Sequence, residues 1–241
     1  MASSLDLQEQ EQLDQLKAFW QRHGNLLTWL VTLVLLALAA YNGWNWWQRE
    51  QAAKASALHA ELERAAQAGE IDRVATAWAD LQARYAGTAY AQQGALLAAR
   101  ALADKDKVEQ AADALKWAAD SATDPAYRVV ARLRWAGLLL DQGKAQDALT
   151  VLEKARGGGF DALVDDRAAD AQMALGQTDQ ARQSLKSAYQ ALPADLEYRR
   201  VVEAKLMSLG VDPASLNEAG KAADKGNEQA ADTAAPKKAA S

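Results

Sequence analysis

The chain contains no cysteine. This absence excludes disulfide bonds, thiol catalysis, zinc–thiolate sites and lipid attachment to an N-terminal cysteine. Proline and phenylalanine are also scarce, with four and two copies among 241 residues. Alanine, a strong helix former, is abundant instead, so the composition favours an all-α chain.

Basic residues are outnumbered, with 27 Lys and Arg against 32 Asp and Glu, which gives a net charge of −5 and a pI near 5.2. Nucleic acids bind basic surfaces because their phosphates are negatively charged, so we do not expect a nucleic-acid partner. The mean hydropathy is only −0.30 although half of the residues are hydrophobic. Alanine explains this difference, because it buries little apolar area.

Residues suited to metal binding or phosphate binding are few. Of the two histidines, His23 and His59, only His59 has a second ligand type on the same helix face, Glu63 four residues later. The glycine-rich stretch Arg156–Phe160 ends a helical pattern and no Gly-Lys-Ser/Thr follows it, so it predicts a helix stop and not a phosphate loop. We therefore expect no metal, no cofactor and no small-molecule substrate.

Paired carboxylates are the remaining candidate for catalysis. Asp165 and Asp166 are adjacent in the sequence, but neighbouring side chains of a helix point in different directions. No nucleophile, base and orienting group can be assembled from the remaining residues. The sequence therefore predicts no catalytic residue and a protein that is not an enzyme.

One uncharged run interrupts the polar chain, from Gly24 to Gln48. As an α-helix it would be about 37 Å long, which exceeds the roughly 30 Å hydrocarbon core of a bilayer. A buried helix of a soluble domain rarely lacks a polar face over this length. Tryptophans gather towards both ends, as in the aromatic belts of membrane proteins: Trp20, Trp29, Trp44, Trp46 and Trp47. The run predicts a transmembrane helix in the lipid bilayer, with these tryptophans as interface anchors.

Two other interpretations of the run remain open, a signal peptide cleaved at the small residues Ala37 and Ala39 and a buried soluble helix. A secretory signal begins with a short positive region, whereas the first 25 residues carry four acidic residues against Lys17 and Arg22. The apolar run also continues past the possible cleavage site. An uncleaved anchor is the favoured interpretation.

The charges beside the run do not determine its orientation. Lys17 and Arg22 precede it and Arg49 and Lys54 follow it, so the positive-inside rule gives a tie.

Four segments after the apolar run resemble one another. Gly143–Ala155 and Gly176–Ala188 align without a gap, each with Ala five, Leu nine and Ala twelve residues after the Gly. Asp106–Ala118 fits with Asp in place of Gly, and Gly69–Leu81 fits loosely. The starts are 37, 37 and 33 residues apart. The pattern predicts a stack of antiparallel helix pairs with a turn at each start, because one pair alone cannot bury its apolar face.

This pattern resembles the tetratricopeptide repeat, whose period is 34 residues. In it, small residues such as Ala111, Ala148 and Ala181 allow close helix approach. Larger residues fill the space between pairs, namely Trp78, Leu115, Leu152 and Leu185. We expect an acidic N-terminal helix over residues 1–23, a transmembrane helix over 24–48, a helical repeat domain over 49–210 and a disordered tail over 211–241. The tail has no large apolar residue beyond Leu216 with which to offset the entropy of ordering.

In such a solenoid the first helix of each pair lines a concave surface. By periodicity this surface carries apolar and arginine side chains: Leu96, Arg100, Val130, Leu133, Arg134, Leu163, Arg167 and Met173. This mixture is typical of surfaces that bind proteins or peptides. The alternative interpretation is that the leucines are core residues and the arginines are merely solvated.

Three stretches together resemble a known family: Leu16–Asn25 before the run, Gly43–Ala52 behind it, and Gly157–Arg182 in the repeats. Their ordered combination resembles the ancillary subunit of the bacterial Sec translocon, over about Leu13 to Leu209. The resemblance implies a single-pass protein of the bacterial inner membrane with a cytoplasmic N-terminus and a periplasmic repeat domain. It also implies association with the Sec channel and with a membrane-anchored, periplasmic prolyl isomerase-like chaperone.

We therefore expect a membrane-anchored, non-enzymatic scaffold that helps to handle newly translocated proteins beside the Sec channel. The alternative is a periplasmic tetratricopeptide adaptor for envelope assembly or cell division without a Sec role.

Overall fold

The computed structural model describes residues 4–216, and no strand occurs among them. The helices are α1 (Ser4–Ala68), α2 (Ile71–Tyr85), α3 (Ala89–Ala103), α4 (Val108–Ser121), α5 (Pro125–Asp141), α6 (Ala145–Glu153), α7 (Asp161–Ala174), α8 (Thr178–Ala191) and α9 (Tyr198–Ser208). The predicted all-α class is therefore confirmed.

The chain divides into two units, Met1–Lys54 and Ala55–Ser241. The first unit holds α1 up to Lys54, and the second holds the rest of α1 together with α2 to α9. The expected acidic helix, the apolar run and the first repeat helix all fall on α1, which is one helix from Ser4 to Ala68. Their separation into three functional segments stays a prediction.

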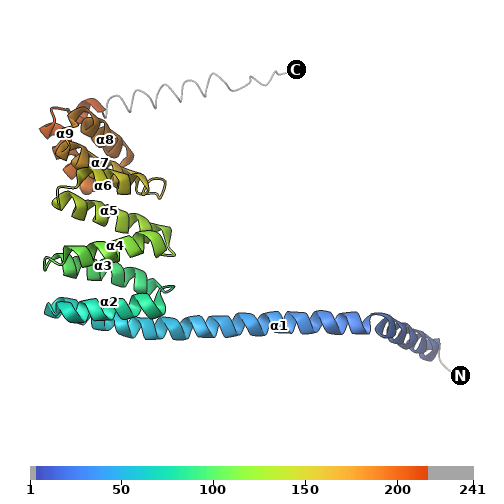
Figure 1. Ribbon diagram of the computed structural model, residues 1–241. Coiled ribbons are helices and arrows are strands. Elements are labelled where there is room, and N and C mark those ends of the chain that lie inside the picture. Colours follow the sequence, from blue (N-terminus) through green and yellow to red (C-terminus); the bar gives the residue numbers. More distant parts are fainter. Residues whose placement is uncertain (1–3, 217–241) are drawn as a thin grey trace, which may run out of the picture. The chain divides into compact units, whose positions relative to one another are not determined.

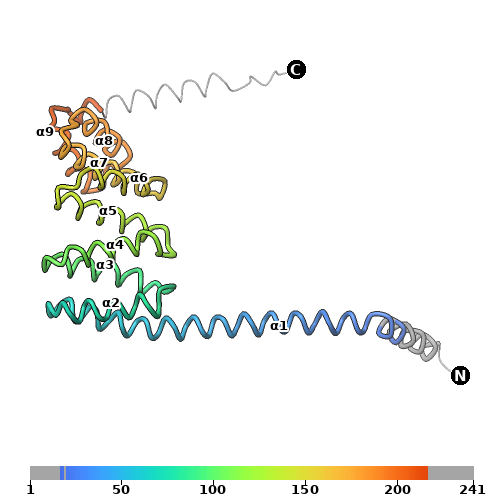
Figure 2. Tube along the Cα trace, in the orientation of Figure 1, coloured from blue at the N-terminus to red at the C-terminus, as the bar shows by residue number. Residues whose placement is uncertain are grey.

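The second unit is a stack of antiparallel helix pairs (Figure 1). Along the Cα trace the chain reverses direction between successive helices, and each pair lies on the one before it (Figure 2). The pairs are α3 with α4, α5 with α6, and α7 with α8, while the end of α1 shares a buried cluster with α2. The predicted solenoid is confirmed.

The turns between paired helices lie at the four predicted positions. Gly69, Asp106, Gly143 and Gly176 have φ angles of +72°, +57°, +73° and +74°, the left-handed conformation. After each of them, the next residue donates its N–H to the carbonyl five positions earlier, at 2.8 or 2.9 Å. This is the hydrogen bond of the Schellman motif, which ends a helix and satisfies one of its last carbonyls. The same backbone device therefore ends the first helix of each pair.

A fifth turn of this kind occurs at Gly210, 34 residues after Gly176, and the sequence interpretation missed it. Gly210 has a φ of +75°, and the Val211 N–H donates to the Leu206 carbonyl at 3.0 Å. Val211 and Leu216 then pack against the last core cluster, and residues 213–216 are helical. The packed chain thus continues past the expected boundary at residue 211. The rest of the predicted tail, residues 217–241, lies outside the described residues.

Asp106 is the one turn residue that carries a side chain in the left-handed conformation. This conformation costs an L-residue roughly 1–2 kcal/mol, although Asp tolerates it better than most. Asp106→Gly removes this strain and stabilises the folded state, but part of the stabilisation is offset because glycine gives the unfolded chain more conformational entropy. We expect Asp106→Gly to stabilise the repeat domain by about 0.5 kcal/mol and to raise its thermal midpoint, followed by circular dichroism. Asp106→Ala, which keeps the Cβ, is the matched control, and an equal rise for both variants would contradict the explanation.

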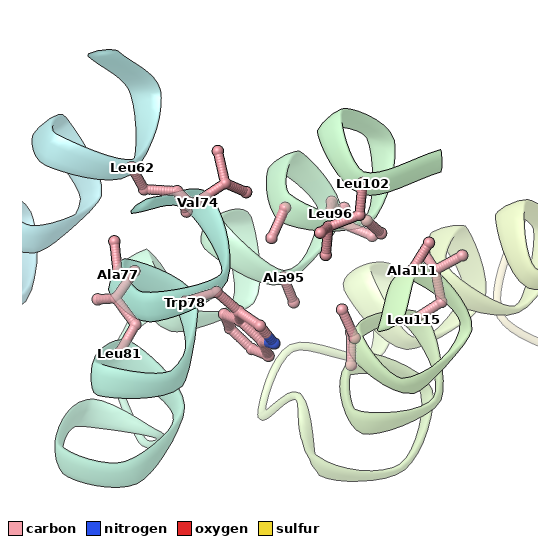
Figure 3. Close-up of a cluster of buried hydrophobic side chains, with 14 of the residues drawn as sticks. Leu62, Val74, Ala77, Trp78, Leu81, Ala95, Leu96, Leu102, Ala111 and Leu115 are labelled. Carbon is pink, nitrogen blue, oxygen red and sulfur yellow. The ribbon is translucent and has the colours of Figure 1, made fainter. Parts of the chain in front are cut away.

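Three clusters of buried residues follow one another along the stack, from α1–α5 through α5–α7 to α7–α9. Figure 3 shows the first cluster, in which Trp78 of α2 lies between the helices beside side chains of α3 and α4. The alanines predicted to allow close approach, Ala111, Ala148 and Ala181, have no exposed surface. Gly94 of α3 allows a further close approach that the sequence did not predict, since a Cβ there would lie 2.9 Å from Leu81 Cδ1.

Candidate protein-binding groove and membrane segment

Within the described residues, α1 is the one helix that is long and apolar enough to cross a membrane. Every leucine and valine between Leu26 and Leu38 exposes 36% to 68% of its surface. The five predicted anchors, Trp20, Trp29, Trp44, Trp46 and Trp47, are exposed as well. A helix that is apolar on all sides needs an apolar environment, so this segment fits a bilayer better than water.

Three polar side chains of the apolar run hydrogen-bond within their own helix. Thr28 Oγ1 donates to the Gly24 carbonyl and Thr32 Oγ1 to the Thr28 carbonyl, both at 2.8 Å. Asn42 Nδ2 donates to the Leu38 carbonyl at 3.0 Å. These hydrogen bonds satisfy donors that would otherwise lack a partner in hydrocarbon.

The tryptophans of α1 are spaced to suit a bilayer. The helix rises about 36 Å from Trp20 to Trp44, slightly more than the hydrocarbon thickness of roughly 30 Å. Behind the run, the rings of Trp44 and Trp47 lie 5.2 Å apart. Indole rings at both ends of a span can lie in the two headgroup layers.

A groove of about 610 Å³ lies on the repeat domain, lined mainly by α3, α5 and α7, the first helices of three successive pairs. We call it the α3–α5–α7 groove. Its large apolar lining residues are Leu115, Val130, Leu133, Leu138, Phe160 and Leu163. Its charged lining residues are Arg100, Arg134, Asp141 and Arg167, and its small ones are Ala99, Ala103 and Gly137. The volume is within the range of ligand-binding sites in proteins.

The structure brings six of the eight predicted surface residues together in this groove: Arg100, Val130, Leu133, Arg134, Leu163 and Arg167. The other two lie elsewhere. Leu96 is 8% exposed and belongs to the first core cluster, where Figure 3 shows it beside Leu102. Met173 is 41% exposed but does not line the groove.

The path of the groove explains both differences. It begins at the C-terminal end of α3, at Arg100 and Ala103, and reaches the N-terminal half of α7, at Leu163 and Arg167. Successive helix pairs of a solenoid are rotated slightly against one another, so the groove crosses the helices obliquely. Leu96, in the middle of α3, and Met173, in the last turn of α7, both lie off this line.

Some lining residues were missed by periodicity. Phe160 precedes α7, in the longer connection after α6, and Asp141 is the last residue of α5. Gly137 lies beside Arg167: a Cβ at residue 137 would lie 3.9 Å from the Arg167 guanidinium carbon, an ordinary van der Waals contact. For Phe160 the sequence offered one signal, the rarity of phenylalanine, since only two occur in the chain.

The three arginines of the groove make two long ion pairs and one backbone hydrogen bond. Arg100 Nε lies 3.9 Å from Asp104 Oδ2, and Arg167 Nη1 lies 3.7 Å from Asp170 Oδ2. Arg134 Nη1 donates to the Leu96 carbonyl at 3.3 Å. Each guanidinium has five N–H donors, so these contacts leave donors available to a ligand.

Asp165 and Asp166 are buried and have separate partners. Asp165 accepts hydrogen bonds from Ser187 Oγ at 2.5 Å and pairs with Arg156 at 2.7 Å. Asp166 accepts hydrogen bonds from Tyr198 Oη at 2.6 Å and from Lys205 Nζ at 2.9 Å. Burial, and then the hydrogen bond to Asp166, raise the pKa of Tyr198 well above its usual value. Both carboxylates therefore tie helices together and do not form an acid–base pair.

Among the described residues, no group of three or more His, Asp or Glu side chains is placed to hold a metal ion. His59, the histidine that the sequence singled out, lies against Tyr90 with its ring centroid 5.8 Å away.

Comparisons with known proteins agree with this architecture. A family model described as a tetratricopeptide repeat-like domain matches residues 17–211. An ancillary SecYEG translocon subunit of Neisseria gonorrhoeae is 28% identical over 204 residues, which cover 84% of this chain and 98% of that protein. An ancillary SecYEG translocon subunit of Haemophilus influenzae is 27% identical over 185 residues, which cover 77% of this chain and 90% of that protein.

The resemblance predicted from the residues around the apolar run and in the repeats is thereby confirmed. The family model covers most of the chain, including the apolar run and all of the helix pairs. The chain belongs to the tetratricopeptide repeat-like domain family.

Proposed function

We propose that this protein is a membrane-anchored, non-enzymatic scaffold that associates with the Sec translocon and assists newly translocated proteins. The observation that carries the proposal is the similarity to two ancillary SecYEG translocon subunits over 98% and 90% of their lengths. The exposed apolar surface of α1 supports attachment to the inner membrane.

In this proposal the N-terminus is cytoplasmic and the repeat domain is periplasmic. A membrane-anchored, periplasmic prolyl isomerase-like chaperone is the second partner. The anchor holds the repeat domain at the membrane surface, which raises its effective concentration near partners that diffuse in the same membrane. The α3–α5–α7 groove, with its exposed apolar and arginine side chains, is the proposed contact surface for protein segments.

Affinity purification of the tagged full chain from detergent-solubilised membranes tests the association. We expect the Sec channel subunits and the chaperone to be recovered, and a tagged single-pass protein of unrelated sequence serves as the control. Recovery of envelope-assembly or division proteins without the channel would support the alternative adaptor and overturn the proposal.

Protease digestion of sealed inner-membrane vesicles of known sidedness tests the orientation. With the cytoplasmic face outward, the repeat domain should be protected until detergent opens the vesicles. Digestion of the repeat domain in intact vesicles of this orientation would overturn the periplasmic placement.

A further inference from the structure

The α3–α5–α7 groove carries a charge opposite to that of the chain. Three arginines and Asp141 line it, so its lining has a formal charge of +2. The whole chain has a net charge of −5, which leaves −7 for all other residues. A positive groove on a negative protein attracts negative partners to one place and repels them elsewhere.

The groove arginines are less closely paired with carboxylates than several surface arginines elsewhere in the repeat domain. Outside the groove, Arg73, Arg84 and Arg182 contact carboxylates within one helical turn at 2.7 to 2.8 Å. The nearest partners recorded for Arg100, Arg134 and Arg167 are 3.3 to 3.9 Å away. Suitable carboxylates stand near two of them, at Asp104 and Asp170, yet the contacts remain long. The three guanidiniums therefore retain N–H groups that can donate to carboxylates from outside the chain.

Apolar side chains line the same groove as these arginines. Leu133 and Val130 of α5 line the groove beside Arg134, and Leu163 of α7 lines it beside Arg167. A charged ligand with no apolar part, such as free phosphate, would leave this apolar surface uncovered. A ligand with both carboxylates and large apolar side chains would cover both kinds of surface.

We infer that the α3–α5–α7 groove selects extended polypeptide segments that carry an acidic residue at about every third position and large apolar residues between them. Packed helices lie roughly 8–10 Å apart, and an extended chain in the polyproline II conformation rises about 3.1 Å per residue and returns to the same face at every third residue. Carboxylates about three residues apart would therefore match arginines on successive first helices, with apolar side chains between them. The inference rests on the proposed function, because it specifies which segments the proposed scaffold takes.

Fluorescence anisotropy with the full chain in detergent micelles tests this selection. The probes are three labelled 12-residue peptides of the same leucine content, with Asp, Asn or Lys at every third position. We expect the Asp peptide to bind at least tenfold more tightly than the Asn peptide at low salt. The difference should shrink as salt screens the charges. Equal affinities for the Asp and Asn peptides, or tighter binding of the Lys peptide, would overturn the inference.

Two triple variants of equal charge locate the binding site. Arg100→Gln, Arg134→Gln and Arg167→Gln together should weaken binding of the Asp peptide by roughly 30-fold or more, if each contact contributes about threefold. The control combines Arg64→Gln, Arg73→Gln and Arg84→Gln, all exposed and outside the groove, and should change the affinity less than threefold. An equal loss in both variants would mean that net charge alone attracts the peptide, which would also overturn the inference.

Affinity purification and the peptide assay, both with the wild-type chain, separate this inference from the proposed function. If the channel is recovered but the Asp peptide shows no preference, the groove inference fails and the Sec association stands. If the peptide preference is present but the channel is not recovered even with the wild-type chain, the proposed association fails and the groove specificity stands.

Discussion

Replacing Lys205 by methionine is expected to weaken the attachment of α9 to the repeat stack by about 3 kcal/mol, the lower end of the range for breaking a buried ion pair. Lys205 Nζ lies 2.9 Å from Asp166 Oδ1 and 2.7 Å from Asp170 Oδ1. The Asp166 side chain is only 2% exposed. Methionine keeps much of the lysine stem but removes its charge, so Asp166 would keep the hydrogen bond from Tyr198 and lose its cation.

Hydrogen exchange of the α9 amides measures this attachment directly. A loss of about 3 kcal/mol corresponds to exchange roughly 100-fold faster, provided that α9 opens locally. The amides of α2 and α3 lie in a different part of the stack, and their exchange should stay nearly unchanged because solenoid repeats contact only their neighbours. Unchanged exchange in α9 would show that the ion pair does not hold this helix.

Asp179→Asn is the matched control for the Lys205 variant. The Arg182–Asp179 pair has the same 2.7 Å separation as Lys205–Asp170, but the Asp179 side chain is 95% exposed. Exposed pairs contribute about 0–1 kcal/mol, so exchange should rise only a few-fold at most. The double variant Lys205→Met with Asp166→Leu should recover part of the loss, because an apolar pair leaves no buried charge without its partner, while the Tyr198 hydroxyl loses its acceptor.

The repeat architecture could be predicted from the sequence because its strongest signals are local. A helix that ends in the left-handed conformation usually has glycine at that one position, and the hydrophobic residues that follow the glycine keep helical spacing. Gly143 and Gly176 were therefore correctly placed at turns, and even Asp106 was identified by its neighbours. Gly210 obeys the same rule, but the polar sequence after it lacks the apolar pattern that marked the other four.

The groove was only partly predictable because its course depends on how helix pairs are rotated in space. Periodicity treats Leu96 and Leu133 as equivalent, since each lies ten residues before a turn residue. In the structure Leu133 lines the groove, whereas Leu96 lies in the core. A small rotation per repeat moves equivalent residues from one surface to another, and no single repeat encodes that rotation.

The buried ion pairs between α7 and α9 could not be predicted from spacing. Asp166 and Lys205 are 39 residues apart, and nothing in either segment marks them as partners. The sequence did indicate that Asp165 and Asp166 face different directions, and their separate partners agree with this.

Placing two lysines in the middle of the apolar run is expected to remove α1 from the membrane. Leu33→Lys and Leu36→Lys each introduce a charge near the centre of the span, at a cost of roughly 3 kcal/mol per residue on insertion scales. The combined cost of about 6 kcal/mol exceeds what the remaining leucines and valines contribute, at roughly 0.3–0.6 kcal/mol each. Extraction of membranes with alkaline carbonate measures the result: the wild type should stay in the pellet and the double variant should be released.

The position of the added charge, and not the charge itself, should decide the outcome. Gln21→Lys with Gln48→Lys adds the same two charges at the ends of the run, where lysine side chains can extend to the headgroups. This control should stay in the pellet with the wild type. The intact mass of the membrane-bound wild type decides between anchor and cleaved signal, because an uncleaved chain keeps its full 25.9 kDa. Release of the wild type by carbonate, or retention of the central double variant, would contradict the assignment of α1 as the membrane anchor.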